Sequence, residues 1–435
     1  MSHTVTYPIY ENRSGWNSLL PKRNINTAQK VESSYDFVVI GAGFTGLAAA
    51  RRLAELNPDA GVLVLEASEV GEGSSARNSG FIISLPHNTK MSGHTSPAEL
   101  ARKQIRIYES GLAWLKTSID THRIECGWNP VGKYHGAATH DGVKGLQSTA
   151  RQYDDWDIDY AEIPKAELAE KIGTSYYQYG LRTMNNVFVQ PAALIRGLAD
   201  TLPNNVTLLE NCPVLSVDSK GQCLLVRTKD HIIKAGKLIL ANNGFAKKLG
   251  FLKDRLITIF TYAGMTPELD DEQLTLHGTD PEWGLIPANR LGTTLRKIQN
   301  RRFMVRSAYS YENAQTQAAV DAMLIDCYRR RYPNLRSHRL EHVWGGVTAL
   351  TRNGATFFGK ASNNLYASVG CNGAGVLKGS VYGKLLAEMI MNEDSQELRD
   401  VLDMEAPSWL PPEPIRRVAV LTAIHLQKKK AGAER

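Results

Sequence analysis

The spacing of hydrophobic positions predicts a strand, a turn and a helix early in the chain. The apolar run from Phe37 to Ile40 reads as a buried strand, and a glycine-containing turn follows it. Leu47, Ala50 and Leu53 then recur at helical spacing. The next apolar run, GVLVLEA, predicts a second buried strand that ends at Glu66.

Further elements are predicted along the rest of the chain. Ser96 is a cap residue with Pro97 at the first helical position, so PAELARKQIRIYESGLAWLKTSI is expected to be a helix. Other helices are expected from Pro191 and over AQTQAAVDAMLIDCYRRRY. Three short strand signals, VTLLE, PVLSVDS and CLLVRTK, precede the apolar run KLILANNG, which is expected to return the chain to a parallel sheet. Near the end, NNLYASVGCNGAGVLKGSVYGKLLAEMIM predicts a strand, a glycine turn and a helix.

Composition narrows the class of protein. The 435 residues are 43% hydrophobic and 22% charged, as in a globular protein long enough for two domains. The net charge of +7 comes from basic residues that are scattered along the chain, which disfavours nucleic-acid binding and favours an anionic cofactor or substrate. Five cysteines with no C-x-x-C pair support neither a disulfide framework nor a zinc site, so no metal is expected. With no signal-like or membrane-spanning apolar run, the expected location is the cytoplasm.

Gly41, Gly43 and Gly46 form the pattern G-x-G-x-x-G between the first strand and its helix, and Glu66 follows Gly46 by twenty residues. In this setting the glycines let the backbone approach a pyrophosphate at the helix N-terminus, and the carboxylate accepts hydrogen bonds from ribose hydroxyls. The alternative is a tight turn that binds no ligand. Because an acid at this position disfavours a ribose phosphate, NAD or FAD is expected rather than NADP.

A second small and polar stretch, GEGSSARNSG, soon follows Glu66 and favours FAD, whose isoalloxazine ring on its ribityl arm must reach deep into the protein. Gly73 and Gly80 let the backbone pass close to a ligand. Hydroxyl, guanidinium and amide groups for pyrophosphate and ribityl oxygens come from Ser74, Ser75, Arg77 and Asn78. An ordinary surface loop is the alternative reading.

The late segment VGCNGAGVLKG strengthens the prediction of FAD. Gly370, Gly373 and Gly375 form a turn ahead of a helix, whose N–H groups and dipole can face the negative charge that develops at the flavin pyrimidine edge on reduction. Contacts near both ends of the chain fit FAD in an extended pose.

Five stretches together carry a resemblance to a known family: VVIGAGFTGLAAARRLAE, VLEASEVGEGSSARNSGF, ILANNGFAKKL, WGGVTALTRNGATFFG and NLYASVGCNGAGV. In this order the chain resembles the D-amino-acid oxidase superfamily, and most of all its branch of γ-glutamylputrescine oxidases and related FAD-dependent amine and amino-acid oxidoreductases. The resemblance implies that a hydride leaves the carbon next to an amine for flavin N5 and that water hydrolyses the resulting imine. The lone pair of a neutral amine drives this step, so little acid–base machinery is expected.

The expected fold class is α/β with an α+β substrate domain, in which a Rossmann-like FAD-binding domain is interleaved with an antiparallel-sheet substrate domain. Residues 1–33 are expected to form an N-terminal arm, and 396–435 a C-terminal tail with a basic helix. The FAD-binding domain is expected over 34–90, 190–250 and 345–395, and the substrate domain over 91–189 and 251–344. The predicted cofactor-binding residues are Gly41, Gly43, Phe44, Thr45, Gly46, Glu66, Ala67, Gly73, Ser74, Ser75, Arg77, Asn78, Ser79, Gly80, Val214, Ala241, Asn242, Gly244, Gly345, Gly370, Asn372, Gly373, Ala374, Gly375 and Val376.

The chain departs from its relatives where some of them tether the flavin. Arg77 and Asn78 stand where a tethering His occurs in the first glycine-rich region, and VTALTRNG contains no Cys, so non-covalent FAD is expected. Secondary-amine relatives have a Lys at the position of Leu377, whereas here Lys378 comes one residue later. That offset turns a helical side chain by about 100°, so Lys378 is either a substrate ligand or solvent-facing.

Three further residues are catalytic candidates besides Lys378. Arg296, on the strand TTLRKI, matches a basic residue that assists oxygen reaction in similar amine oxidases, and an ion pair or a sheet-surface role is its alternative. His87 and Trp344 are candidates for lining the flavin ring, with a loop histidine and core packing as their alternatives.

Three functions remain open from the sequence. The first is oxidation of a primary amine such as a γ-glutamyl-amine, whose carboxylate suits the basic balance. The second is an amine or amino-acid dehydrogenase that passes electrons to a quinone, with the C-terminal IRRVAVLTAIHLQKKK in peripheral contact with the inner membrane surface. The third is a flavin-binding module without turnover. The electron acceptor is therefore oxygen or a quinone or other carrier.

Overall fold

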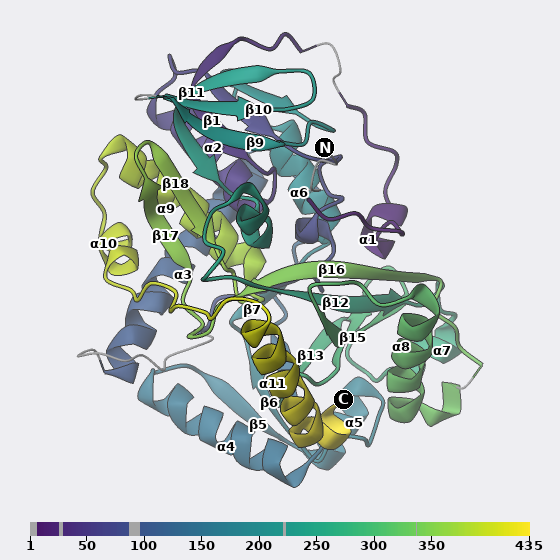
Figure 1. Ribbon diagram of the computed structural model, residues 1–435. Helices are drawn as coiled ribbons and strands as arrows, with labels where there is room; N and C mark the ends of the chain where they lie inside the picture. The colour runs from purple at the N-terminus through teal and green to yellow at the C-terminus, as the bar shows by residue number, and fades with distance from the viewer. Residues whose placement is uncertain (1–6, 26–28, 87–95, 221–222, 336) are drawn as a thin grey trace.

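The computed structural model describes residues 7–25, 29–86, 96–220, 223–335 and 337–435. Two modules, each built on an eight-stranded sheet, lie one above the other in Figure 1. A short ribbon of β3 (Phe81–Ile83) and β7 (Asn186–Phe188) is a separate two-stranded sheet.

The sheet of the first module is largely parallel. Its parallel strands, in spatial order, are β18 (Leu365–Val369), β11 (Ile232–Leu240), β1 (Ser34–Ile40), β2 (Val62–Leu65) and β8 (Val206–Leu209). The antiparallel additions are β17 (Phe357–Ser362) beside β18, β10 (Cys223–Arg227) beside β11, and β9 (Ser216–Lys220) beside β10.

Both faces of this sheet are buried, which explains its continuous apolar strands. Val39 and Val64 face a core shared with helices on one side, whereas Val38 and Leu63 face the β9–β10 hairpin and η2 (Asn243–Leu249) on the other. The helices on the first side are α2 (Phe44–Leu56), α3 (Pro97–Thr121), α6 (Pro191–Asp200), α9 (Gly375–Met391) and α10 (Gln396–Leu402).

The sheet of the second module is antiparallel except where β13 runs parallel to β4. Its strands, in spatial order, are β16 (His342–Leu350), β12 (Ile257–Met265), β15 (Arg302–Tyr311), β14 (Thr294–Ile298), β13 (Trp283–Pro287), β4 (Lys133–Ala137), β6 (Tyr179–Thr183) and β5 (Tyr160–Pro164). The helices and turns of this module are α4 (His140–Asp155), α5 (Lys165–Ile172), α7 (Asp271–Thr275), α8 (Gln317–Arg331) and η3 (Pro333–Leu335).

The two faces of the second sheet meet different neighbours. Phe303 and Val305 pack in a core with α8, whereas Met304 belongs to the same core as the helices of the first module. Because side chains alternate along a strand, one face of β15 is turned towards the first module. This face forms one wall of the space between the modules.

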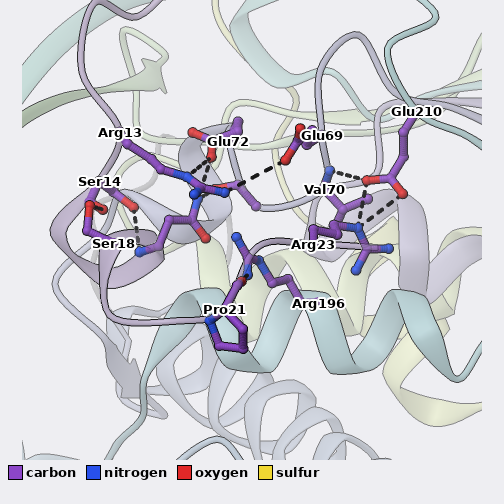
Figure 2. A network of polar contacts seen from close by, with 12 residues as sticks. Arg13, Ser14, Ser18, Pro21, Arg23, Glu69, Val70, Glu72, Arg196 and Glu210 are labelled. Atoms are coloured by element: carbon purple, nitrogen blue, oxygen red, sulfur yellow. Dashed lines mark hydrogen bonds and ion pairs between the residues drawn. The ribbon is translucent and has the colours of Figure 1, made fainter. Parts of the chain in front are cut away.

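The N-terminal arm is fixed by ion pairs and hydrogen bonds to the first module (Figure 2). Arg13 contacts Glu72 at 2.8 Å, and Arg23 contacts Glu210 at 2.8 Å. Its one helical turn, α1 (Gly15–Ser18), carries Trp16, which is fully buried. The arm is therefore an integral part of the packed structure over its described residues.

The C-terminal helix α11 (Ile415–Ala431), yellow in Figure 1, lies against the second module. Val420 and Ile424 pack on Tyr309 of β15. The following turn, η4 (Gly432–Glu434), buries Glu434, whose carboxylate accepts hydrogen bonds at the start of α4.

The predicted fold class is confirmed, including the Ser96 cap and Pro97 start of α3. Of the three short strand signals, VTLLE forms the parallel edge strand β8 beside β2, whereas the other two form the antiparallel pair β9 and β10. The predicted boundary at residue 345 falls inside β16, which pairs with β12 over its whole length. We therefore propose a division in which all of His342–Leu350 belongs to the second module, and keep the other predicted bounds as proposals.

Candidate active site

The first glycine turn brings the end of β1 and the start of α2 very close together. Gly41 has φ +105°, a backbone conformation that favours glycine. A Cβ on Gly46 would lie 1.8 Å from the carbonyl oxygen of Gly41, so no other residue fits there. Gly43 caps α2 and leaves the positive end of the helix dipole facing a cavity.

Glu66 follows β2 directly and lines the same cavity. Its carboxylate accepts hydrogen bonds from the backbone N–H groups of Ala42 at 2.8 Å and Ser68 at 3.2 Å. Burial raises the pKa of this carboxyl group, while the backbone donors oppose that shift. Since a carboxylate has about four acceptor sites, Glu66 can still accept ribose hydroxyls.

The stretch after Glu66 folds into η1 (Ser74–Ala76) beneath the start of α2. The hydroxyl of Ser75 accepts from the N–H of Phe44 at 3.2 Å, and that of Ser74 donates to the carbonyl of Val347 at 2.6 Å. A Cβ on Gly73 would meet no atom within 4 Å, so this backbone borders open space. The stretch therefore ties the glycine turn to β16 and leaves room for a ligand.

Arg77 has a different role from the one predicted for its guanidinium. Its donors go to the carbonyl oxygens of Glu72 at 2.7 Å, Gly345 at 3.0 Å and Asn12 at 2.8 Å. The guanidinium also lies 3.8 Å from the ring centre of Tyr10. Arg77 lines the cavity, but its hydrogen-bonding groups join the arm, η1 and β16 instead of pointing at a phosphate.

The second glycine turn precedes α9. Asn372 donates from its amide to the carbonyls of Gly370 at 2.8 Å and Gly354 at 2.9 Å, and accepts from the N–H of Thr351 at 2.9 Å. Gly373 has φ +89°, and a Cβ there would again meet no atom within 4 Å. This turn therefore presents bare backbone to the cavity at the N-terminus of α9.

A cavity of about 610 Å³ extends from these turns to the second sheet. Its size lies in the range of about 300–1,000 Å³ found for small-molecule and cofactor sites. The predicted cofactor residues line it with the exception of Gly46, Gly80, Gly345 and Gly370. These four residues lie behind the cavity wall. Gly46 contacts Gly41, and Gly80 contacts Arg296. The Gly345 carbonyl accepts a hydrogen bond from Arg77, and the Gly370 N–H donates one to Asn243.

The wall of this cavity fits FAD. Asn242 Oδ1 and Thr261 Oγ1 are buried in lining residues and have no hydrogen-bond partner among the described residues. Buried polar atoms are normally satisfied, so these two favour a polar ligand. Together with two helix N-termini and the bare backbone at Gly73 and Gly373, they provide what a pyrophosphate and a ribityl chain require.

The family model described as "DAO: FAD dependent oxidoreductase" matches residues 36–389, which is most of the chain. The chain belongs to the DAO family. It is therefore an FAD-dependent oxidoreductase, as predicted.

DAO-family relatives are similar over most of their length but at low identity. A probable oxidoreductase OrdL from Rhizobium meliloti is 23% identical, covering 92% of this chain and 93% of the relative. A gamma-glutamylputrescine oxidoreductase from Escherichia coli is 24% identical, covering 82% and 84%. Among solved structures, glycine oxidase from Geobacillus kaustophilus matches with a TM-score of 0.71 at 15% identity, covering 84% of this chain and 96% of that one, which shows the fold.

Of the four catalytic candidates, Lys378 lines the DAO-type cavity. It lies in the first turn of α9, with its ammonium 5.5 Å from the ring centre of Tyr382. Burial lowers the pKa of Lys378 to about 8. The side chain of Lys378 therefore lines the cavity and does not face solvent on the outer surface.

Arg296 and Trp344 do not line the cavity. Arg296 is 2% exposed, pairs with Glu282 at 2.8 Å, and donates to the carbonyls of Ser79 at 3.0 Å and Val189 at 2.9 Å, so the ion-pair alternative describes it. Trp344 is buried beneath the arm and donates to the carbonyl of Arg77 at 3.2 Å, so core packing describes it. His87 lies outside the described residues.

Sequence reasoning missed the part of the cavity formed by the arm, the second sheet and the C-terminal helix. These lining residues include Tyr7, Tyr10, Thr261, Tyr262, Arg290, Arg306, Tyr309 and Ile424. Alternation along RFMVRSAYSY could have placed Arg306 on the same face as Met304. Which way that face points depends on sheet packing, for which the local sequence has no signal.

Proposed function

We propose that this protein oxidises a primary amine at one end of a γ-glutamyl amide, with γ-glutamylputrescine as the first substrate to test. The observation that carries the proposal is the cavity itself, which continues from the glycine turns to a wall of the second sheet that bears Arg290 and Arg306. A substrate with a carboxylate at one end and an amine at the other suits such a cavity. The similarity to the Escherichia coli gamma-glutamylputrescine oxidoreductase supports the same substrate class.

When bound, FAD supplies the two-electron oxidation of the carbon next to the amine. The chain supplies apolar side chains to the cavity wall, among them Phe81, Ile83, Ile259 and Ile286. The product is an imine, which water hydrolyses to an aldehyde and ammonia.

Lys378 is proposed to contact the substrate amine. With a pKa of about 8, a sizeable fraction of its side chain is neutral at pH 8 and can accept a proton from the substrate ammonium group. The substrate then enters the reaction as the neutral amine, whose lone pair is required. Lys378 in turn becomes the ammonium ion and returns its proton to solvent.

Anaerobic visible spectroscopy of the holoprotein tests the proposal directly. γ-Glutamylputrescine should bleach the flavin absorbance, and free putrescine and common amino acids should do so far more slowly. If the flavin stays oxidised with γ-glutamylputrescine but is bleached by an amino acid, the substrate class is wrong.

The second candidate is a dehydrogenase that delivers electrons to a quinone at the inner membrane surface, and one observation favours it. Ile415, Val418, Leu421 and Leu426 on α11 are 44–65% exposed, next to the basic run Lys428–Lys430. Exposed apolar side chains beside lysines are typical of helices that lie on anionic membranes. No helix in the described part of the chain has the length and apolarity to cross a bilayer.

Co-sedimentation with vesicles that contain anionic lipid separates the two electron acceptors. Binding that is lost in Val418→Ser together with Leu426→Ser would favour the quinone route. Failure of the unmodified protein to bind would remove the membrane route and favour a cytoplasmic oxidase that uses oxygen, which is the location and reaction that we propose first.

A further inference from the structure

Arg306 reaches the cavity from the second sheet. It lies directly opposite Ala263 on β12 and Thr294 on β14. It stands two residues after Met304, which packs in the core of the first module, so its side chain leaves the sheet on that same face. Arg306 lines the cavity and is half-buried there.

Tyr309 holds the guanidinium of Arg306 in place. Arg306 Nη1 donates to the Tyr309 hydroxyl at 2.7 Å, and the guanidinium carbon lies 4.9 Å from the centre of the Tyr309 ring. That hydroxyl in turn donates to the carbonyl oxygen of Arg290 at 2.8 Å. The Tyr309 hydroxyl therefore connects the guanidinium of Arg306 to the backbone at Arg290.

No described residue uses the remaining donors of Arg306. Among the described residues, Arg306 makes no ion pair, and its side chain donates one hydrogen bond, to Tyr309. Arg290 also lines the cavity, is exposed at its edge, and makes no ion pair with a described residue. A guanidinium has five N–H donors, so the pair offers several donors to an anion.

The acids of the cavity lie elsewhere. Its described acidic lining residues are Glu66 and Glu72, and both belong to the first module near the glycine turn. Glu66 accepts backbone N–H groups, and Glu72 pairs with Arg13 and Arg77. The end of the cavity formed by the second sheet therefore has positive charge and no acidic lining residue in the described part of the chain. Arginine is the side chain best suited to bind a carboxylate with two parallel hydrogen bonds.

We propose that Arg306, positioned by Tyr309 and assisted by Arg290 at the cavity edge, binds the carboxylate of the substrate while the substrate amine points inward to the glycine turns. This inference rests on the proposed function, since it assigns the carboxylate end of the same substrate. It makes Arg306 a specificity-determining residue that selects a γ-glutamyl amide over the free diamine, which has no carboxylate. A substrate with a carboxylate at only one of its ends then has a single productive orientation.

The test separates binding from turnover by using a ligand that lacks the amine proposed to be oxidised. The probe is γ-glutamylpropylamide, which keeps the carboxylate and lacks the terminal amine, and its partner is the same compound with the carboxylate converted to a carboxamide. Binding to the oxidised holoprotein is followed by the change in the flavin visible spectrum. The variants are Arg306→Met and Arg306→Lys, with Arg151→Met as the matched control, because Arg151 is exposed on α4 and does not line the cavity.

We expect the carboxylate probe to bind the unmodified protein and Arg151→Met equally. Its affinity should fall by about 10- to 100-fold in Arg306→Met, the lower part of the range for losing one partner of a charge pair, because Arg306 is only half-buried. Arg306→Lys should recover part of that loss, and the carboxamide should bind weakly to every variant. Tyr309→Phe should weaken carboxylate binding by several-fold and raise the γ-glutamylputrescine concentration needed for half-maximal flavin reduction.

Three results would overturn the subsite. The first is equal binding of the carboxylate and carboxamide probes to the unmodified protein. The second is undiminished binding of the carboxylate probe to Arg306→Met. The third is loss of FAD from both Arg306→Met and Arg306→Lys, which would assign the arginine to the cofactor. If the carboxylate probe binds as expected but γ-glutamylputrescine does not bleach the flavin, the subsite stands and the proposed function fails.

Discussion

Replacing Arg296 with methionine should destabilise the protein strongly without changing how its flavin reacts with an acceptor. The guanidinium is 2% exposed and pairs with Glu282, which is itself 5% exposed. Breaking a buried pair by removing one partner costs about 3–5 kcal/mol, because the other charge stays buried. The carbonyls of Ser79 and Val189 lose a donor as well.

The magnitude translates into a modest change in melting temperature for a chain of this size. At about 2.1 cal/mol/K per residue, 435 residues give an unfolding entropy of about 0.9 kcal/mol/K if the chain melts as one unit. A loss of about 4 kcal/mol should therefore lower Tm by roughly 4 °C, measured in excess FAD so that cofactor binding stays constant.

A double-mutant cycle checks the cause. Glu282→Gln alone should also destabilise, and the double variant should lose less than the sum of the two because the residues interact. Additive losses within about 0.5 kcal/mol would contradict the pairing. An unchanged Tm with slower reoxidation of the reduced flavin would refute the structural role and restore Arg296 as a catalytic residue.

Three other predictions concern charge and cofactor attachment. Lys133 is 3% exposed, and burial lowers its pKa to about 7 from 10.5. The free-energy cost of burying its charge is therefore fully present below pH 7 and disappears as pH rises towards 10.5. Lys133→Met should raise the free energy of unfolding by about 1–3 kcal/mol at pH 7, and thermal melts at higher pH should show a smaller gain. Because the pKa of Lys378 is about 8, the rate of flavin reduction at low γ-glutamylputrescine concentration should rise with pH through this value. In stopped-flow measurements Lys378→Met should lack that rise, whereas the control Lys384→Met, in the same helix, should keep it. Acid precipitation should release all of the yellow flavin into the supernatant, because the FAD is expected to be non-covalent. Yellow colour that stays in the pellet, and that is lost in Cys371→Ser, would instead show a covalent link to this cavity-lining cysteine.

The half of the site around the first glycine turn could be predicted because its geometry is local. Gly41 and Gly46 meet within one turn, and Glu66 ends the adjacent strand, so spacing alone brings the three together. Arg306 escaped prediction because its direction depends on which face of the second sheet meets the first module. Arg296 lies on the predicted strand, but its side chain binds Glu282 and the carbonyl of Ser79 instead of lining the cavity. These partners come from distant parts of the chain, so the local sequence could not indicate them.

The N-terminal arm has a consequence for the rate at which the cofactor exchanges. Tyr10 lines the cavity from the arm and lies under the guanidinium of Arg77, while Trp16 donates to the carbonyl of Asn78 at 2.8 Å. The arm therefore forms part of the wall around a bound cofactor. We therefore expect release of FAD to follow the opening rate of the arm more than the strength of the cofactor's own contacts, so that the holoprotein keeps its flavin through dilution and gel filtration. Arg13→Ala, which removes the ion pair to Glu72, should speed that release while the equilibrium affinity changes much less.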